Sequence, residues 1–268
     1  MRLSGVESPK VCAVTLACAL LLLGLGGCAT SAQFPSASST RPAMLSAAVA
    51  RPAGTGPFPA VILLPGCGGV TAHTLAWAAW LNGRGYLTIA ADSLGPRGVR
   101  DACTQFRERP TMAVIAEDAL GVLRHARSLP DVDPARVGVM GWSYGGTAAL
   151  WVGDADSKMA TEGFRAVIAF YPGCAIADPA VPTLLLLGEA DRLTPPGWCL
   201  SQAERLKARQ GPEVQVALYP GATHSFDEVG LGAGQTHRGE FMKYDGAATA
   251  DAQQRIERFL RRYLARQQ

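Results

Sequence analysis

The ten residues at positions 137–146, Val-Gly-Val-Met-Gly-Trp-Ser-Tyr-Gly-Gly, join an apolar run to a serine between glycines and the start of a helix-forming segment. Ser143 lies between Gly141 and Gly145, in the order G-x-S-x-G. A strand, a tight turn and a helix in this order hold a serine hydroxyl above the end of the strand. The glycines permit a turn that residues with a Cβ could not make without a clash. The alternative is a glycine-rich loop with a purely structural role, and residues farther along the chain bear on that choice.

A serine hydroxyl becomes a good nucleophile when a base takes its proton and an acid orients the base. On a strand–turn–helix scaffold of this kind the acid and then the histidine follow the serine, each after a later strand. Asp191 follows one apolar strand run and His224 follows the next. We therefore predict Ser143, Asp191 and His224 as nucleophile, acid and base. Glu189 and Asp178 are the competing acids.

The chain has four histidines, and only His224 has this order and setting. We expect His125 in a helix upstream of the serine, on its surface or packed there. His73 is expected near the N-terminus of another helix. His237 follows a glycine-rich stretch with no strand to position it. These three are therefore not predicted as the base.

An acyl-transfer site also needs backbone N–H groups that stabilise a developing oxyanion. One should come from Tyr144, the residue after the nucleophile. The other should come from the loop Gly66-Cys-Gly-Gly69, which follows an apolar strand. There Cys67 is the expected donor and Gly68 the alternative. Neither a Walker loop nor G-x-G-x-x-G is present at this position, so a phosphate-binding loop is not indicated.

Several motifs together resemble the dienelactone hydrolase family of α/β-hydrolases. They are Pro57-Phe-Pro-Ala-Val61, Pro65-Gly-Cys-Gly-Gly69, Asp92-Ser-Leu-Gly-Pro-Arg-Gly98, Asp133 to Gly146, Phe170-Tyr-Pro-Gly173, Gly188-Glu-Ala-Asp191 and His224-Ser-Phe226. The resemblance runs from about residue 50 to the C-terminus. The best-known members carry cysteine as the nucleophile, where this chain has Ser143. The resemblance therefore implies a serine esterase more directly than it implies a dienelactone substrate.

Alternating apolar and helical stretches predict a doubly wound, mostly parallel sheet in a single domain, and the family resemblance implies that this is the α/β-hydrolase fold. Strands are expected near 59–64, 86–91, 136–141, 165–171, 182–187 and 214–219, with a weaker edge strand in 43–52. Helices are expected near 72–83, 111–128, 145–153, 197–210 and 247–265; in the last, apolar residues recur at helical spacing. Segments 92–110 and 227–245 follow strand ends on the side where such sheets bind ligands. We expect them, with Trp142, Tyr171 and Trp198, to line the substrate pocket.

The composition indicates a globular chain. Of its 268 residues 48% are hydrophobic and 18% charged, and the net charge is +3. This balance gives no basic surface for nucleic acid, so no nucleic-acid partner is expected. A triad mechanism with water as the second substrate also implies neither a metal nor an organic cofactor.

The N-terminus is typical of an export signal. Val11–Leu25 is an uncharged, mostly apolar run of 15 residues, short for a membrane-spanning helix. It ends in Leu25-Gly-Gly-Cys28, which resembles the lipobox of bacterial lipoproteins. We therefore expect a signal peptide over 1–27, acylation of Cys28, a flexible tether over 28–45 and the α/β-hydrolase domain over 46–268. The expected location is the cell envelope, anchored to the membrane and facing the periplasm; a signal cut elsewhere or an uncleaved anchor is the alternative.

Four cysteines besides Cys28 would remain after processing, and an exported domain with four cysteines is expected to form two disulfides. Three pairings are open. The α/β-hydrolase fold implies that the strands before Cys67 and Cys103 are neighbours, and likewise those before Cys174 and Cys199. By this analogy we expect the pairs 67–103 and 174–199.

These observations predict a hydrolase acting on a small-molecule carboxylic ester, lactone or thioester through an acyl-enzyme on Ser143. Two alternatives remain. An acyltransferase would use the same triad with an alcohol as acceptor. A non-catalytic envelope lipoprotein would bind a ligand or partner and would need no reactive serine.

Overall fold

The computed structural model describes residues 30–155, 163–174, 178–237 and 239–266. An eight-stranded sheet forms its centre, in the order β1-β2-β4-β3-β5-β6-β7-β8. The strands are Thr30–Pro35 (β1), Met44–Ala50 (β2), Phe58–Leu64 (β3), Leu87–Asp92 (β4), Val132–Trp142 (β5), Val167–Phe170 (β6), Thr183–Gly188 (β7) and Val214–Tyr219 (β8). The strands from β4 to β8 in this order are parallel, whereas β1 and β2 are antiparallel to their neighbours. The predicted doubly wound, mostly parallel sheet is confirmed.

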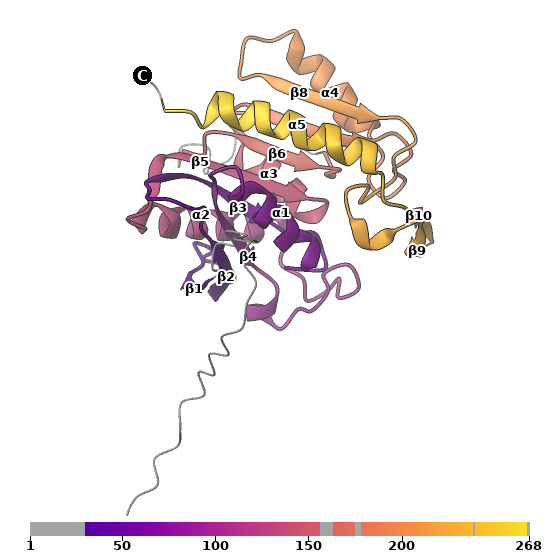
Figure 1. Cartoon of the computed structure of the whole chain (residues 1–268). Coiled ribbons are helices and arrows are strands. Elements are labelled where there is room, and N and C mark those ends of the chain that lie inside the picture. Colours follow the sequence, from indigo (N-terminus) through magenta and orange to yellow (C-terminus); the bar gives the residue numbers. More distant parts are fainter. Residues whose placement is uncertain (1–29, 156–162, 175–177, 238, 267–268) are drawn as a thin grey trace, which may run out of the picture.

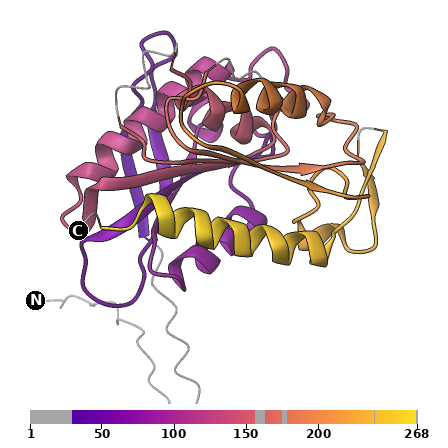
Figure 2. The same cartoon turned by 90° about the horizontal axis from the view of Figure 1, so that it is seen from above.

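Helices cover both faces of the sheet (Figures 1 and 2). They are Ala72–Asn82 (α1), Met112–Ser128 (α2), Tyr144–Val152 (α3), Gly197–Lys207 (α4) and Gly246–Tyr263 (α5). Seen from above, α1 and α5 lie below the sheet and the other three lie above it (Figure 2). All five predicted helices are present, with ends shifted by at most three residues. Within the described residues, none of them combines the length and the apolar character needed to cross a bilayer.

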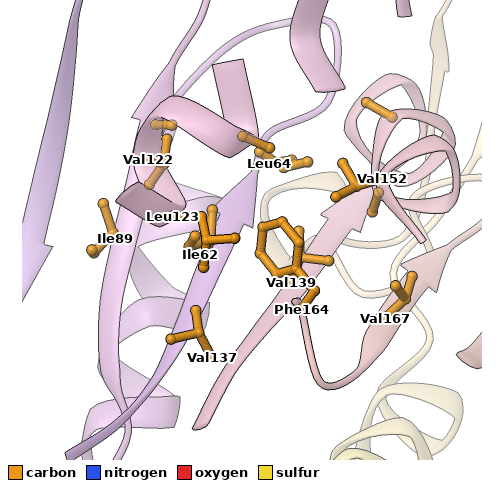
Figure 3. Packing of buried hydrophobic residues seen from close by; sticks show 14 of the residues in the cluster. Ile62, Leu64, Ile89, Val122, Leu123, Val137, Val139, Val152, Phe164 and Val167 are labelled. Atoms are coloured by element: carbon orange, nitrogen blue, oxygen red, sulfur yellow. The ribbon is translucent and has the colours of Figure 1, made fainter. Parts of the chain in front are cut away.

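Side chains alternate along the central strands and so build a separate core on each face. On β3, Ile62 and Leu64 belong to the cluster beneath α2 and α3 (Figure 3), whereas Val61 and Leu63 belong to the cluster beneath α1 and α5. A strand buried on both faces must be apolar at every position, which explains the unbroken apolar run in its sequence.

The N-terminal part of the domain differs from the sequence-based expectation. Residues 30–35, expected within a flexible tether, form β1 and pair with β2 over six residues, so the tether prediction is wrong there. Phe34 is buried and stacks on the His125 ring with centroids 4.9 Å apart. The small polar residues of this segment are compatible with an exposed edge strand as well as with a tether. The burial of Phe34 favours the strand. The strand expected in 43–52 is present as β2, but β1 occupies the edge. The expected signal peptide and Cys28 lie outside the described residues.

Strand order places the candidate residues together. From β3 the chain moves outward to β4 and then returns to the other side of β3 as β5, so the direction of winding reverses between β3 and β5. Ligands bind at the carboxyl ends of strands beside such a reversal. The loop with Cys67 follows β3, and Ser143 follows β5. The segment after β8 continues through two short elements, Val229–Leu231 (η3) and a hairpin of Gln235–His237 (β9) and Glu240–Met242 (β10).

Candidate active site

Ser143 occupies a strained turn between β5 and α3. Its φ is 50° and its ψ is −111°, a conformation that non-glycine residues rarely adopt. The turn is closed tightly, because a Cβ on Gly141 would overlap the backbone of Gly145, and a Cβ on Gly145 would overlap the Leu64 carbonyl at the end of β3. The two glycines of the motif are therefore required by close backbone approach. The fold holds the serine at the N-terminus of α3.

The three predicted catalytic side chains lie within hydrogen-bonding distance of one another. His224 Nε2 is 3.0 Å from Ser143 Oγ, and His224 Nδ1 is 2.7 Å from Asp191 Oδ2. Asp191 and His224 are buried, whereas Ser143 is partly exposed. The carboxylate thus fixes one imidazole nitrogen, and the other nitrogen faces the serine hydroxyl. This arrangement can transfer a proton from the serine to the histidine.

The competing residues lie elsewhere. Glu189 accepts a hydrogen bond from the Gly221 N–H at 3.3 Å, and Asp178 pairs with Arg209 at 3.2 Å. Neither is bonded to His224 in the described part of the chain. The geometry therefore favours Asp191 as the histidine's partner.

Thr194 completes the site, and its role had not been inferred from the sequence. Its hydroxyl lies 2.8 Å from Asp191 Oδ2, 2.9 Å from the Tyr171 carbonyl oxygen and 3.1 Å from His224 Nδ1. The N–H groups of Leu193 and Thr194 both donate to Asp191 Oδ1 at 2.9 Å. The local signal was present, because an aspartate three residues before a threonine is typical of a turn in which the carboxylate accepts backbone N–H groups.

The two predicted oxyanion donors lie on neighbouring loops. Tyr144 is the first residue of α3, so its N–H cannot donate within the helix. Within the described ranges, neither this N–H nor that of Cys67 has a hydrogen-bond acceptor. The Cys67 carbonyl accepts from Ala102 N–H at 2.8 Å, which ties the loop after β3 to the loop after β4. The described residues therefore leave both N–H groups without an acceptor, as the oxyanion prediction requires.

Both expected disulfides are present. Cys67 pairs with Cys103, and Cys174 pairs with Cys199, each with a Cα–Cα distance of 5.2 Å. The first pair joins the Cys67 loop covalently to the segment after β4. The second joins the segment after β6 to α4, which follows the Asp191 loop.

The expected pocket residues occupy different environments. Trp142 and Tyr171 are each only 2% exposed, so the expectation that they line a substrate pocket is wrong. Trp142 packs against Phe170 in the core, because the last residue of a central strand still points into the cluster under α1 and α5. Tyr171 lies behind His224, with ring centroids 4.5 Å apart. Trp198, at the start of α4, is 74% exposed, and its role in the pocket stays a prediction.

His73 is a polar residue near a helix N-terminus, as expected, and it also has a buried partner that the sequence did not indicate. It lies in the first turn of α1, and its Nε2 is 2.8 Å from Asp227 Oδ2. Burial lowers the pKa of His73, but the Asp227 carboxylate more than offsets this, so the pKa is raised above its ordinary value. The structure therefore contains a second Asp–His pair, which the sequence did not reveal.

Comparison with known proteins agrees with this fold. A putative carboxymethylenebutenolidase of Synechocystis is 23% identical over 227 residues, which are 78% of this chain and 88% of that protein. A putative dienelactone hydrolase structure from Klebsiella pneumoniae is 22% identical, with a TM-score of 0.70, and the match covers 88% of this chain and all of that one. Thermogutta terrifontis esterase 2, solved after phosphorylation by paraoxon, is 21% identical with a TM-score of 0.64 over 89% and 96% of the two chains.

The family model of dienelactone hydrolases matches residues 45–264, from β2 to the end of α5. This range includes the serine turn, the Cys67 loop and the loops that carry Asp191 and His224. The protein belongs to the dienelactone hydrolase family.

Proposed function

We propose that this protein is a serine hydrolase that cleaves a carboxylic ester, lactone or thioester through an acyl-enzyme on Ser143. One observation carries the proposal. His224 lies between Ser143 and Asp191 with both contacts at hydrogen-bonding distance, and Ser143 itself lies in a strained turn at the carboxyl end of the sheet. Burying a carboxylate and an imidazole beside a strained serine is difficult to explain by stability alone.

In the proposed reaction His224 takes the Ser143 proton through Nε2 as the oxygen attacks the substrate carbonyl. The resulting oxyanion accepts hydrogen bonds from the Cys67 and Tyr144 N–H groups. Collapse of the intermediate breaks the bond to the leaving oxygen or sulfur, and His224 returns the proton to it. Water, deprotonated by the same imidazole, then hydrolyses the acyl-enzyme and regenerates the serine.

Two relatives are consistent with this assignment. The Synechocystis relative is named a putative carboxymethylenebutenolidase, and the Thermogutta enzyme is an esterase that paraoxon phosphorylates. Organophosphates react with activated nucleophiles, so the same chemistry provides a direct test of this chain.

We further propose that the protein is exported and acylated at Cys28, so that it lies in the cell envelope. Two disulfides support an oxidising compartment, because such bonds are rare in reducing cytosol. If so, wild-type protein should partition into detergent, and Cys28→Ala should be soluble or unprocessed. Wild-type protein free in the periplasmic fluid, with an N-terminus downstream of Cys28, would contradict this.

A fluorophosphonate probe tests the activity. It should label Ser143, and Ser143→Ala should abolish labelling and reduce turnover of p-nitrophenyl esters on the order of 10⁴-fold or more. His237→Ala is the matched control, since this exposed histidine lies outside the triad and should leave turnover within about threefold of wild type. Wild-type turnover in Ser143→Ala would refute the assignment. Product analysis with added alcohols would separate hydrolysis from acyl transfer.

A further inference from the structure

Asp227, three residues after His224, is a buried carboxylate surrounded by hydrogen-bond donors. Its Oδ2 lies 2.8 Å from His73 Nε2 and accepts from Trp77 Nε1 at 2.8 Å and from Trp142 Nε1 at 3.0 Å. The Tyr171 hydroxyl donates to Oδ1 at 2.6 Å. The carboxylate thus joins α1 to the ends of β5 and β6 and to the loop that follows β8.

Two of these partners adjoin the residues of the proposed reaction. Trp142 immediately precedes Ser143, so its bond to Asp227 fixes the end of the strand that carries the serine. The Tyr171 ring contacts the His224 imidazole, with centroids 4.5 Å apart and ring planes tilted by 55°. A change at Asp227 would therefore reach both residues through a single intervening side chain.

Backbone strain is concentrated at the same place. Among the described residues, the non-glycine positions with positive φ are Ser143 at 50°, Tyr171 at 34° and Ser225 at 57°. One follows Trp142, the second is itself a partner of Asp227, and the third lies between His224 and Asp227. Strained conformations persist only where surrounding contacts hold them. The hydrogen bonds of Asp227 supply such contacts next to all three positions.

Charge makes these bonds strong. Burial raises the pKa of Asp227, but its contacts with His73, Tyr171 and Trp77 more than offset this, so the pKa is lowered and the group stays ionised. Burial and the neighbouring carboxylate raise the pKa of Tyr171 well above its ordinary value, so its hydroxyl remains a donor. An apolar core would satisfy packing without a buried charge, which suggests that the carboxylate serves to fix geometry.

We infer that Asp227 is a positioning residue for the reaction proposed above, acting through Tyr171 on His224 and through Trp142 on Ser143. The inference rests on that proposed function. Because a displacement of about 1 Å at a catalytic group can cost on the order of 100-fold in rate, modest loosening of this carboxylate should be visible in catalysis.

The test compares Asp227→Asn and Tyr171→Phe with Asp118→Asn. Asp118 is a second buried carboxylate, bonded to Arg97 at 2.8 Å and to Ser36, and it contacts no triad residue in the described part of the chain. All three variants should lose thermal stability. Asp227→Asn should slow fluorophosphonate labelling of Ser143 and lower kcat on the order of 10-fold or more, with KM within about threefold of wild type. Asp118→Asn should label at the wild-type rate.

The double variant Asp227→Asn/Tyr171→Phe should label about as slowly as Asp227→Asn alone, because both changes act on the same hydrogen bond, from the Tyr171 hydroxyl to Asp227. Wild-type labelling rates in folded Asp227→Asn and Tyr171→Phe would overturn the inference, as would equal slowing in Asp118→Asn. If Asp227→Asn does not fold, Tyr171→Phe decides, because it keeps the ring and removes only the hydroxyl. Labelling of Ser143→Ala at the wild-type rate would instead mean that the proposed function itself is wrong.

Discussion

Replacing Thr194 by valine tests how the Asp191 carboxylate is held. Valine keeps the shape of the side chain but removes the hydroxyl, which lies 2.8 Å from Asp191 Oδ2 and 3.1 Å from His224 Nδ1. The carboxylate retains its backbone donors from residues 193 and 194 and its contact with His224. One of four contacts is therefore lost. A hydrogen bond to a charged group contributes about 1.5–3 kcal/mol, which corresponds to a fall in kcat of about 10- to 160-fold if it is expressed in the transition state.

The effect should fall on kcat, with KM nearly unchanged. Thr194 contacts Nδ1, whereas the nitrogen that faces Ser143 is Nε2. The assay is steady-state hydrolysis of a p-nitrophenyl ester, with a thermal melt of each variant to confirm folding. Thr194→Ser restores the hydroxyl and should recover most of the lost rate. A valine variant with wild-type kcat, or a serine variant as slow as the valine one, would refute this reasoning.

Three further predictions concern stability. Gly145→Ala should lower the free energy of unfolding by about 1–3 kcal/mol and abolish probe labelling, because the new Cβ overlaps a β3 carbonyl; an active, wild-type-stable variant in a urea titration would contradict this. The double variant Cys67→Ala/Cys103→Ala removes the disulfide that joins residues 36 positions apart, and it should lower the free energy of unfolding by about 4 kcal/mol in the same titration. An unchanged urea midpoint would contradict a stabilising role for this disulfide. The raised pKa of His73 means that its pair with Asp227 stabilises the fold at low pH and loses this contribution as pH rises through the folded-state pKa. The free energy of unfolding should therefore fall as the pH rises from the ordinary histidine pKa through the raised folded-state pKa of His73, and His73→Asn should reduce that dependence. Equal pH dependence in both proteins would argue against the ion pair.

Much of the site follows from sequence because it depends on local rules. The G-x-S-x-G turn requires glycines wherever the chain reverses so closely, so the pattern identifies Ser143 without reference to the rest of the fold. The order of strands along the chain then places Asp191 and His224 in loops at the same edge of a parallel sheet. Strand adjacency also implied the two disulfides, since loops after neighbouring strands lie side by side.

Other features were decided only by tertiary packing. Whether Thr30–Pro35 pairs as a strand depends on one aromatic side chain finding a partner on α2, which composition does not reveal. Trp142 and Tyr171 could face a pocket or the core until the helices on each face are placed. The contact between His73 and Asp227 joins residues 154 positions apart. Hydrogen bonds between such distant side chains leave no period or spacing in the sequence. Local sequence patterns thus indicate which residues could react, whereas the three-dimensional arrangement of buried polar groups decides what holds those residues in place.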